Sequence, residues 1–194
     1  MRMFRLLALS TLFALAAGLA GCKVDTVNPV APPAAAKADP ALYGVWRYRE
    51  KDEITYVHVG PAFALGEAKE GQPMRVVIVD HKPNGVTVED YLAYGTPVGK
   101  QRYLSVAQEE NGKRVGFLIV RYRVEGNAVR FATVDGKALA EAIRGGRIAG
   151  TTRGEGLAAE TTITAEPAAI EAFLAGAPET LFNAPVTLRR VAGR

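Results

Sequence analysis

Residues 74–94 read MRVVIVDHKPNGVTVEDYLAY and show the pattern on which the fold depends. The segments Met74–Asp80 and Val86–Tyr94 are rich in β-branched and aromatic residues, which are enriched in strands. The residues between them, Lys82-Pro83-Asn84-Gly85, are typical of a turn. The stretch therefore predicts two antiparallel strands joined by a short hairpin.

The same alternation of short strand and turn continues on both sides of this hairpin. Turn residues occur at Glu110–Lys113, Glu125–Asn127 and Gly154–Gly156. The other predicted strands are Gly44–Arg49, Ile54–Val59, Arg102–Ala107, Val115–Val124, Ala128–Val134, Ile148–Arg153, Leu157–Thr164 and Val186–Val191. Regularly spaced short strands favour an antiparallel meander, so we predict a mainly β fold of about 8–10 strands in a barrel or a sandwich.

Two short helices are predicted among the later strands. Asp135 is a suitable N-cap for a helix through Arg144, because two glycines follow that residue. Thr164 is predicted to cap a second helix through Leu174, with Pro167 in its first turn. We expect both helices to pack against the sheet.

The first 22 residues have the parts of an export signal. Arg2 and Arg5 give a positive start, and Leu6–Leu19 is an uncharged, mainly apolar run. The run has about 14 residues, fewer than the ~20 that a helix needs to cross a bilayer, so it is a signal core. Leu19-Ala20-Gly21-Cys22 resembles the lipobox of bacterial lipoproteins, in which the Cys is acylated and becomes the first residue of the mature chain. On this resemblance residues 1–21 are the signal peptide. The alternative is an ordinary secretory signal cut at an Ala-x-Ala site, for which Ala14-Leu15-Ala16 is the nearest candidate.

The resemblance to lipoproteins has consequences for cysteine chemistry and for location. Cys22 is the only Cys in the chain, so its acylation leaves neither a disulfide nor a free thiol for the folded domain. Two or more acyl chains, such as palmitate, hold a protein stably at a membrane. In the lipoprotein family, a residue other than Asp after the Cys implies transfer to the outer membrane, and here that residue is Lys23. We therefore expect a lipid-anchored protein of the cell envelope, at the outer membrane and facing the periplasm.

The segment after Cys22 has a composition typical of a linker. Lys23–Ala38 combines three Pro with Ala, Val and Asn and has no hydrophobic period. We expect residues 22–38 to form an extended tether that spans up to ~50 Å at ~3.1 Å per residue. A single β-rich domain is expected over residues 39–194.

The charge of the chain argues against nucleic acid as a partner. Removal of Arg2 and Arg5 with the signal leaves 22 basic residues against 20 acidic ones, so the formal charge falls from +4 to +2. Nucleic-acid-binding domains carry a basic patch or stripe and a high net charge. We therefore expect no binding of nucleic acid.

The start of the predicted domain resembles the lipocalin family. Leu42-Tyr43-Gly44-Val45-Trp46 looks like the short turn and first strand bearing Gly-x-Trp in that family. In lipocalins this Trp packs at the closed end of the barrel, and an Arg from the final strand lies over it. Trp46 matches the first element, and either Arg189 or Arg190 is the candidate for the second. The resemblance implies a lipocalin-like barrel that binds a lipophilic ligand.

The residues after Cys22 provide few groups for catalysis, namely two His and one Ser. Ser105 lies within a predicted strand and lacks the Gly-x-Ser-x-Gly context of an exposed nucleophile. His81 follows Asp80, but a zinc site takes three or four such ligands. We expect no enzyme, no metal site and no cofactor.

Three residues are candidates for contact with a ligand. Tyr56 and His58 share one face of their predicted strand, opposite Val57. They line a cavity if that face points inward and lie on the surface if it points outward, and the sequence leaves both arrangements open. Because His is seldom fully buried, the surface is favoured. Asp90 shares a face with Val88, so it would point into the core beside an Arg or a Tyr.

Two functions fit these features. The first is the binding of a small apolar ligand in a cavity on the order of several hundred Å³, lined by residues such as Tyr56, Phe63, Phe117 and Phe131. The second is an envelope protein with a filled core that holds a protein partner on a sheet edge or an aromatic patch.

Overall fold

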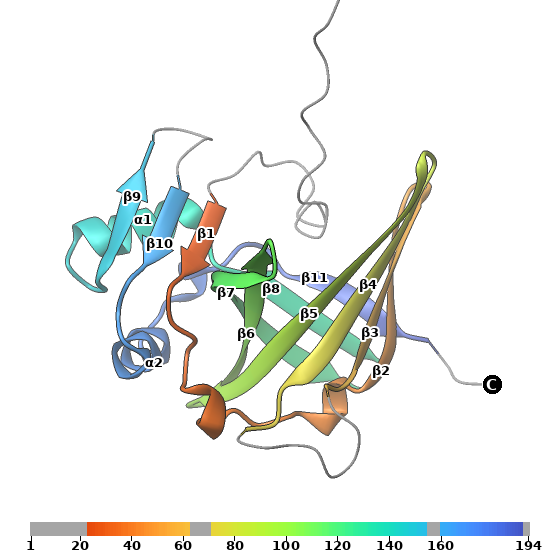
Figure 1. Ribbon diagram of the computed structural model, residues 1–194, viewed down its shortest axis with the longest axis horizontal. Helices are drawn as coiled ribbons and strands as arrows, with labels where there is room; N and C mark the ends of the chain where they lie inside the picture. Colours follow the sequence, from red (N-terminus) through yellow and green to blue (C-terminus); the bar gives the residue numbers. More distant parts are fainter. Residues whose placement is uncertain (1–22, 63–70, 155–159, 192–194) are drawn as a thin grey trace, which may run out of the picture.

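A closed antiparallel β-barrel forms the main body of the protein, as seen in a computed structural model that describes residues 23–62, 71–154 and 160–191 (Figure 1). The barrel strands follow the order β6-β5-β4-β3-β2-β11-β8-β7, and pairing of β6 with β7 closes the ring. Their bounds are β2 Gly44–Glu50, β3 Glu53–Pro61, β4 Met74–Lys82, β5 Gly85–Val98, β6 Gln101–Glu110, β7 Lys113–Glu125, β8 Ala128–Thr133 and β11 Val186–Arg190. The predicted mainly β fold is confirmed, and it is a barrel and not a sandwich.

Short turns fix the register between successive strands of the barrel. Asn111 and Gly112 have φ of 53° and 72° and join β6 to β7, where Glu110 pairs with Lys113. Positive φ at both central residues defines the type I′ turn, whose twist matches that of the flanking strands. The Pro83-Asn84 turn likewise joins Lys82 of β4 to Gly85 of β5. The predicted hairpin at residues 74–94 is therefore present, and its second strand continues to Val98.

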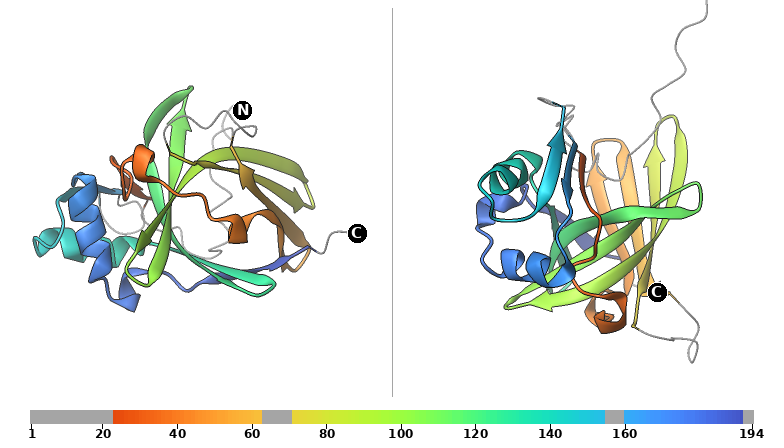
Figure 2. Two further views of the ribbon diagram at one scale, coloured as in Figure 1. Left: turned by 90° about the horizontal axis from the view of Figure 1, so that it is seen from below. Right: turned by 60° about the vertical axis from the view of Figure 1, so that its left-hand side comes forward.

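A smaller layer of strands and helices lies on one side of the barrel (Figure 2). Strand β1, Lys23–Thr26, runs parallel to β10, Glu160–Ile163, and β10 pairs with β9, Gly150–Arg153. Helices α1, Gly136–Arg144, and α2, Pro167–Ala175, complete this layer. Its core contains the fully buried Leu139, Ile163 and Ile170, together with barrel residues such as Tyr103 and Ile119. The layer thus buries the outer wall of part of the barrel.

The two helices begin by different means. The Asp135 carboxylate accepts a hydrogen bond of 2.8 Å from Ala138 N, so the predicted N-cap of α1 is confirmed. The predicted cap of α2 by Thr164 is wrong, because that helix begins at Pro167 and Glu166 occupies the N-cap position without a side-chain bond. Proline at the first helical position has a φ suited to the helix and no N–H to satisfy, which favours the start of α2 at this residue.

Residues 23–38 do not form the free tether expected from their composition. They provide strand β1 and then a segment, residues 27–38, that packs against β5 and β6 of the barrel. We call this segment the strap. Val30 is fully buried in the strap, and its N–H donates to Ser105 Oγ at 2.9 Å. Lys37 N donates to Gly95 O at 2.9 Å. The strap and β1 are therefore part of the packed structure, and the expected reach of ~50 Å does not apply to them.

Candidate ligand-binding cavity

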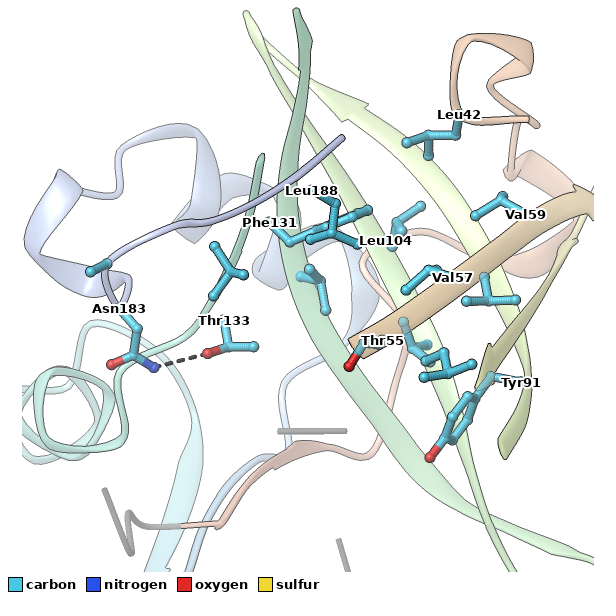
Figure 3. Close-up of a pocket in the computed structure, with 16 residues that line it drawn as sticks. Leu42, Thr55, Val57, Val59, Tyr91, Leu104, Phe131, Thr133, Asn183 and Leu188 are labelled. Carbon is cyan, nitrogen blue, oxygen red and sulfur yellow. Dashed lines mark hydrogen bonds between the residues drawn. The ribbon is translucent and has the colours of Figure 1, made fainter. Parts of the chain in front are cut away.

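The interior of the barrel contains a mainly apolar cavity of about 120 Å³ that is partly open to solvent (Figure 3). Alternation along each strand points one set of side chains inward, and this set supplies the lining. Four lining residues are polar: Thr55, Tyr91, Thr133 and Asn183. The apolar lining includes Val57, Val59, Val76, Ile78, Leu104, Val106, Val120, Phe131, Val186 and Leu188. The interior is therefore a site for apolar surface with a few polar contacts.

Leu42 lies at one end of the cavity, in the short 3₁₀-helix η3, Pro40–Leu42 (Figure 3). Trp46 of β2 is fully buried near it and donates from Nε1 to Leu42 O at 2.7 Å. The Arg190 guanidinium stacks on the Trp46 ring, with Cζ 4.0 Å from the centroid. Its Nη1 and Nη2 donate to Tyr43 O at 2.5 Å and to Ala41 O at 2.7 Å. These contacts hold η3 across this end of the barrel.

The structure decides between the two arginines considered for this contact. Arg190 lies over Trp46, while Arg189 is exposed and pairs in register with Arg47 of β2. Gly44 precedes the tryptophan by two residues with φ of +128°, and a Cβ there would lie 2.7 Å from Arg190 Nη1. The glycine of Gly-x-Trp is thus needed both for its backbone and for the space that the guanidinium occupies.

Polar groups gather toward the end of the cavity away from Leu42 (Figure 3). Thr55 Oγ1 donates to Asp80 Oδ1 at 2.5 Å, and Asp80 is only 3% exposed. The Tyr91 hydroxyl donates to Glu89 Oε2 at 3.0 Å. Burial raises the pKa of the Tyr91 phenol, and the carboxylates of Glu89 and Asp80 raise it further. The Tyr91 phenol therefore stays protonated at pH values above the ordinary pKa of tyrosine, and its hydroxyl continues to donate to Glu89.

Asn183 and Thr133 form a second polar pair in the wall (Figure 3). Asn183 Nδ2 donates to Thr133 Oγ1 at 2.9 Å and more weakly to Val134 O at 3.4 Å. The backbone N–H of Asn183 also donates to Thr133 O at 2.9 Å. The side-chain amide donors are therefore used within the protein, and the Asn183 Oδ1 acceptor remains for a ligand.

The predicted ligand residues lie on the outer wall of the barrel. His58 is exposed and Tyr56 is half-buried, and Tyr56 forms an edge contact with His81 at 5.7 Å between ring centroids. Asp90 is also exposed and is paired with Arg75, with 2.5 Å between Arg75 Nη2 and Asp90 Oδ2. The hydrogen bond from Arg75 lowers the pKa of the Asp90 carboxyl. The expectation that Asp90 points into the core is wrong.

Register explains why the opposite residues of these strands line the cavity. Trp46 points inward and pairs with Val57, so β3 turns Thr55, Val57 and Val59 inward. Tyr91 pairs with Val76 on the inner face of β4, which leaves Asp90 outside. The inward position of Trp46 and the Lys51-Asp52 turn were signals that could have identified the Val57 face from the sequence.

The aromatic residues expected in the cavity separate in the structure. Phe131 lines the cavity, and Phe117 packs on the outer face of the barrel with Tyr94, 6.1 Å between ring centroids. Phe63 lies outside the described residues.

The groups considered for catalysis and metal binding make other contacts in the part of the chain that the structure describes. Ser105 is fully buried and its Oγ accepts a hydrogen bond from Val30 N, so this hydroxyl holds the strap against β6. Within residues 23–62, 71–154 and 160–191, no group of three His, Cys, Asp or Glu side chains could hold a metal ion.

Three arginines of β7 and β8 form ion pairs with glutamates. Arg121 pairs with Glu179 at 2.6 Å, and Arg123 and Arg130 both pair with Glu125 at 3.3 Å.

No protein-family model, curated protein or solved structure matches the chain. In the part of the chain that the structure describes, neither helix has the length and hydropathy to cross a membrane. The cavity geometry is therefore the main basis for a functional argument.

Proposed function

We propose that this is a lipid-anchored protein of the cell envelope whose barrel binds a small apolar ligand. The observation that carries the proposal is the apolar cavity of about 120 Å³ inside the closed barrel. Barrels of eight strands have an interior just wide enough either to be filled by side chains or to hold one small ligand. Here the side chains leave room, and a retained cavity costs stability, so a binding role accounts for it.

The size of the cavity limits the ligand. Pockets for drug-sized molecules have volumes of roughly 300–1,000 Å³, whereas an engineered apolar cavity of about 150 Å³ binds benzene. A cavity of about 120 Å³ therefore suits one ring or a short alkyl chain. Each methylene buried there contributes ~0.8 kcal/mol to binding.

Titration with 1-octanol, followed by isothermal calorimetry, tests the binding site. We expect the wild-type protein to bind and Val57→Phe to lose binding, because a larger side chain at this lining position fills the cavity. Val88→Phe is the matched control, since Val88 is 64% exposed and points away from the cavity on β5. Equal binding by Val57→Phe and wild type would place the site elsewhere and contradict the proposal.

The lipid anchor at Cys22 is the second part of the proposal and is supported by the lipobox-like sequence Leu19-Ala20-Gly21-Cys22. Strand β1 begins at Lys23, directly after this residue, so an anchor there would hold the domain close to the bilayer and not on a long leash. We propose the outer membrane, facing the periplasm. Mass spectrometry of the N-terminal peptide from native membranes should find acylated Cys22, and membrane fractionation tests the location. An unmodified thiol or another start site contradicts the anchor.

A second candidate function, the holding of a protein partner, is favoured by the outer wall of β3, β4 and β5. In one cross-strand row, Tyr56 neighbours Val79 and Val79 neighbours Val88, and Val86 beside this row is 56% exposed. Exposed apolar side chains in a row are typical of an interaction surface. A photo-crosslinker at position 88 in intact envelopes should capture a protein if this function holds. One at position 57, inside the barrel, should not.

A further inference from the structure

The polar end of the cavity presents hydrogen-bond acceptors and keeps its donors for the protein. The Thr55 hydroxyl donates to Asp80, and the Tyr91 hydroxyl donates to Glu89. Because a hydroxyl has one donor and two lone pairs, both oxygens can face a ligand only as acceptors. Asn183 shows the same preference, since its amide donors bind Thr133 and Val134 O. A ligand group at this end must therefore supply donors.

Asp80 is a buried carboxylate for which the described residues provide no basic partner. It is 3% exposed and lies in register between Thr55 and Thr87 on the inward face of the sheet. Among the described residues, no Lys, Arg or His nitrogen lies within 4.0 Å of it, although Lys82 follows on the same face. Burial of an unpaired charge is costly, so a positive group near Asp80 would recover part of that cost.

Glu89 adds a second negative charge on the same face. Its register partner in β4 is Ile78, which lines the cavity. Thr55 and Tyr91 both line the cavity, and their hydroxyls donate to Asp80 and Glu89 respectively, so the two carboxylates lie directly behind the cavity wall. The charge at this end is therefore negative, while the opposite end at Leu42 is apolar.

We propose that the natural ligand is a small cationic amphiphile, in which a protonated amine is joined to a single ring or a short alkyl chain. The apolar part fills the cavity among Val57, Leu104 and Phe131. The ammonium donates to the Thr55 and Tyr91 oxygens, and the carboxylates behind these two hydroxyls balance its charge. This inference rests on the proposed binding function and specifies the chemical class of the ligand.

Three probes of equal length test the charge preference in the wild-type protein: n-octylamine, 1-octanol and octanoate, titrated by calorimetry at neutral pH. We expect octylamine to bind about tenfold more tightly than octanol, since a hydrogen bond to a charged group is stronger than a neutral one. Octanoate should bind most weakly, because it brings a third negative charge and no donor.

Asp80→Asn and Glu89→Gln remove the charges one at a time. Each should lower the affinity for octylamine about tenfold and leave the affinity for octanol within about twofold. Asp90→Asn is the matched control, because this carboxylate lies next to Glu89 in the chain but on the outer wall, paired with Arg75. It should change none of the three affinities. Where Asp80→Asn does not fold, Glu89→Gln and the ranking of the three probes on wild type decide.

The possible results distinguish the cationic ligand class from the proposed binding function on which it rests. Equal affinities for the three probes, or tighter binding of octanoate, overturn the cationic ligand and leave the apolar cavity as a binding site. Failure of all three probes to bind the wild-type protein overturns the proposed function and this inference together.

Discussion

Arg190 contributes to stability through contacts that no neighbouring residue duplicates. Its guanidinium covers Trp46 and donates to two backbone carbonyls of the segment that closes the barrel. We expect Arg190→Ala to lower the free energy of unfolding by about 2–3 kcal/mol, since hydrogen bonds to a charged group contribute about 1.5–3 kcal/mol and a cation–π contact adds to this. Urea unfolding measures the change.

Arg189→Ala is the matched control for that prediction. Arg189 is exposed, and a surface substitution away from special contacts changes stability by about 0.5 kcal/mol or less. Equal losses in the two variants would show that the stacked arginine has no special role.

Tyr91 should make stability depend on alkaline pH. Burial and the neighbouring carboxylates raise its pKa in the folded state above the unfolded value of about 10. Below about pH 10 both states are protonated and the contribution is fully present. Above that, the unfolded state loses its proton first, so stability falls as pH rises. Tyr91→Phe should show a smaller fall between about pH 9 and pH 11 in urea unfolding, and an unchanged fall contradicts the assignment.

At the scale of single residues, the sequence identified the closed end of the barrel better than the cavity. Trp46 and a terminal-strand arginine could be chosen because a specific pair of residue types suggested their contact. Tyr56, His58 and Asp90 were chosen for their chemistry, but which face of a strand points inward depends on register with its neighbours. If Trp46 is paired with Val57 across the first turn, Val57 shares the inward face with Trp46, and Tyr56 and His58 face outward.

The strap is the element whose attachment to the barrel is most easily tested. A Cβ at Gly95 would overlap the carbonyl oxygen of Lys37, and backbone atoms cannot yield as a flexible side chain can. We expect Gly95→Ala to destabilise the protein by about 1–3 kcal/mol. The Lys37 side chain is exposed and its backbone N–H donates to Gly95 O, so loss of this bond should release the backbone at Lys37 for cleavage by trypsin. Limited proteolysis with mass spectrometry locates the cut.

Gly60→Ala is the control for the strap, because a Cβ at Gly60 meets nothing within 4 Å. It should leave both stability and the tryptic pattern close to wild type. Resistance of Lys37 to trypsin in Gly95→Ala would show that the strap tolerates the added methyl group and is not held as described.

At the scale of elements, the strands were predictable and the strap was not. Each barrel strand carries its own signal in alternation and flanking turn residues, as in the hairpin of residues 74–94. The segment 23–38 has no such period. Its structure comes from distant partners, because β1 pairs with β10 more than a hundred residues later and Val30 bonds to Ser105. Local composition therefore indicated a linker where tertiary contacts form a packed element.

At the scale of the whole molecule, closure of the barrel creates the cavity and the side layer leaves it open. Pairing of β6 with β7 completes the ring, and the helices α1 and α2 pack outside it. The inward side chains of the ring are mostly Val, Leu and Ile, which leave about 120 Å³ unfilled. The sequence predicted a mainly β fold, but the volume left inside depends on how all the inward side chains meet.

Native mass spectrometry of the protein isolated gently from its own membranes tests the central claim most directly. We predict that wild-type protein carries a small additional mass that is released on denaturation and is absent from Val57→Phe, whose larger side chain fills the cavity. Val88→Phe, altered on the outer wall, should retain the mass. A wild-type protein that shows only the mass of its covalent structure, with no additional mass, as expected for Val57→Phe, would contradict the claim that the barrel binds a ligand.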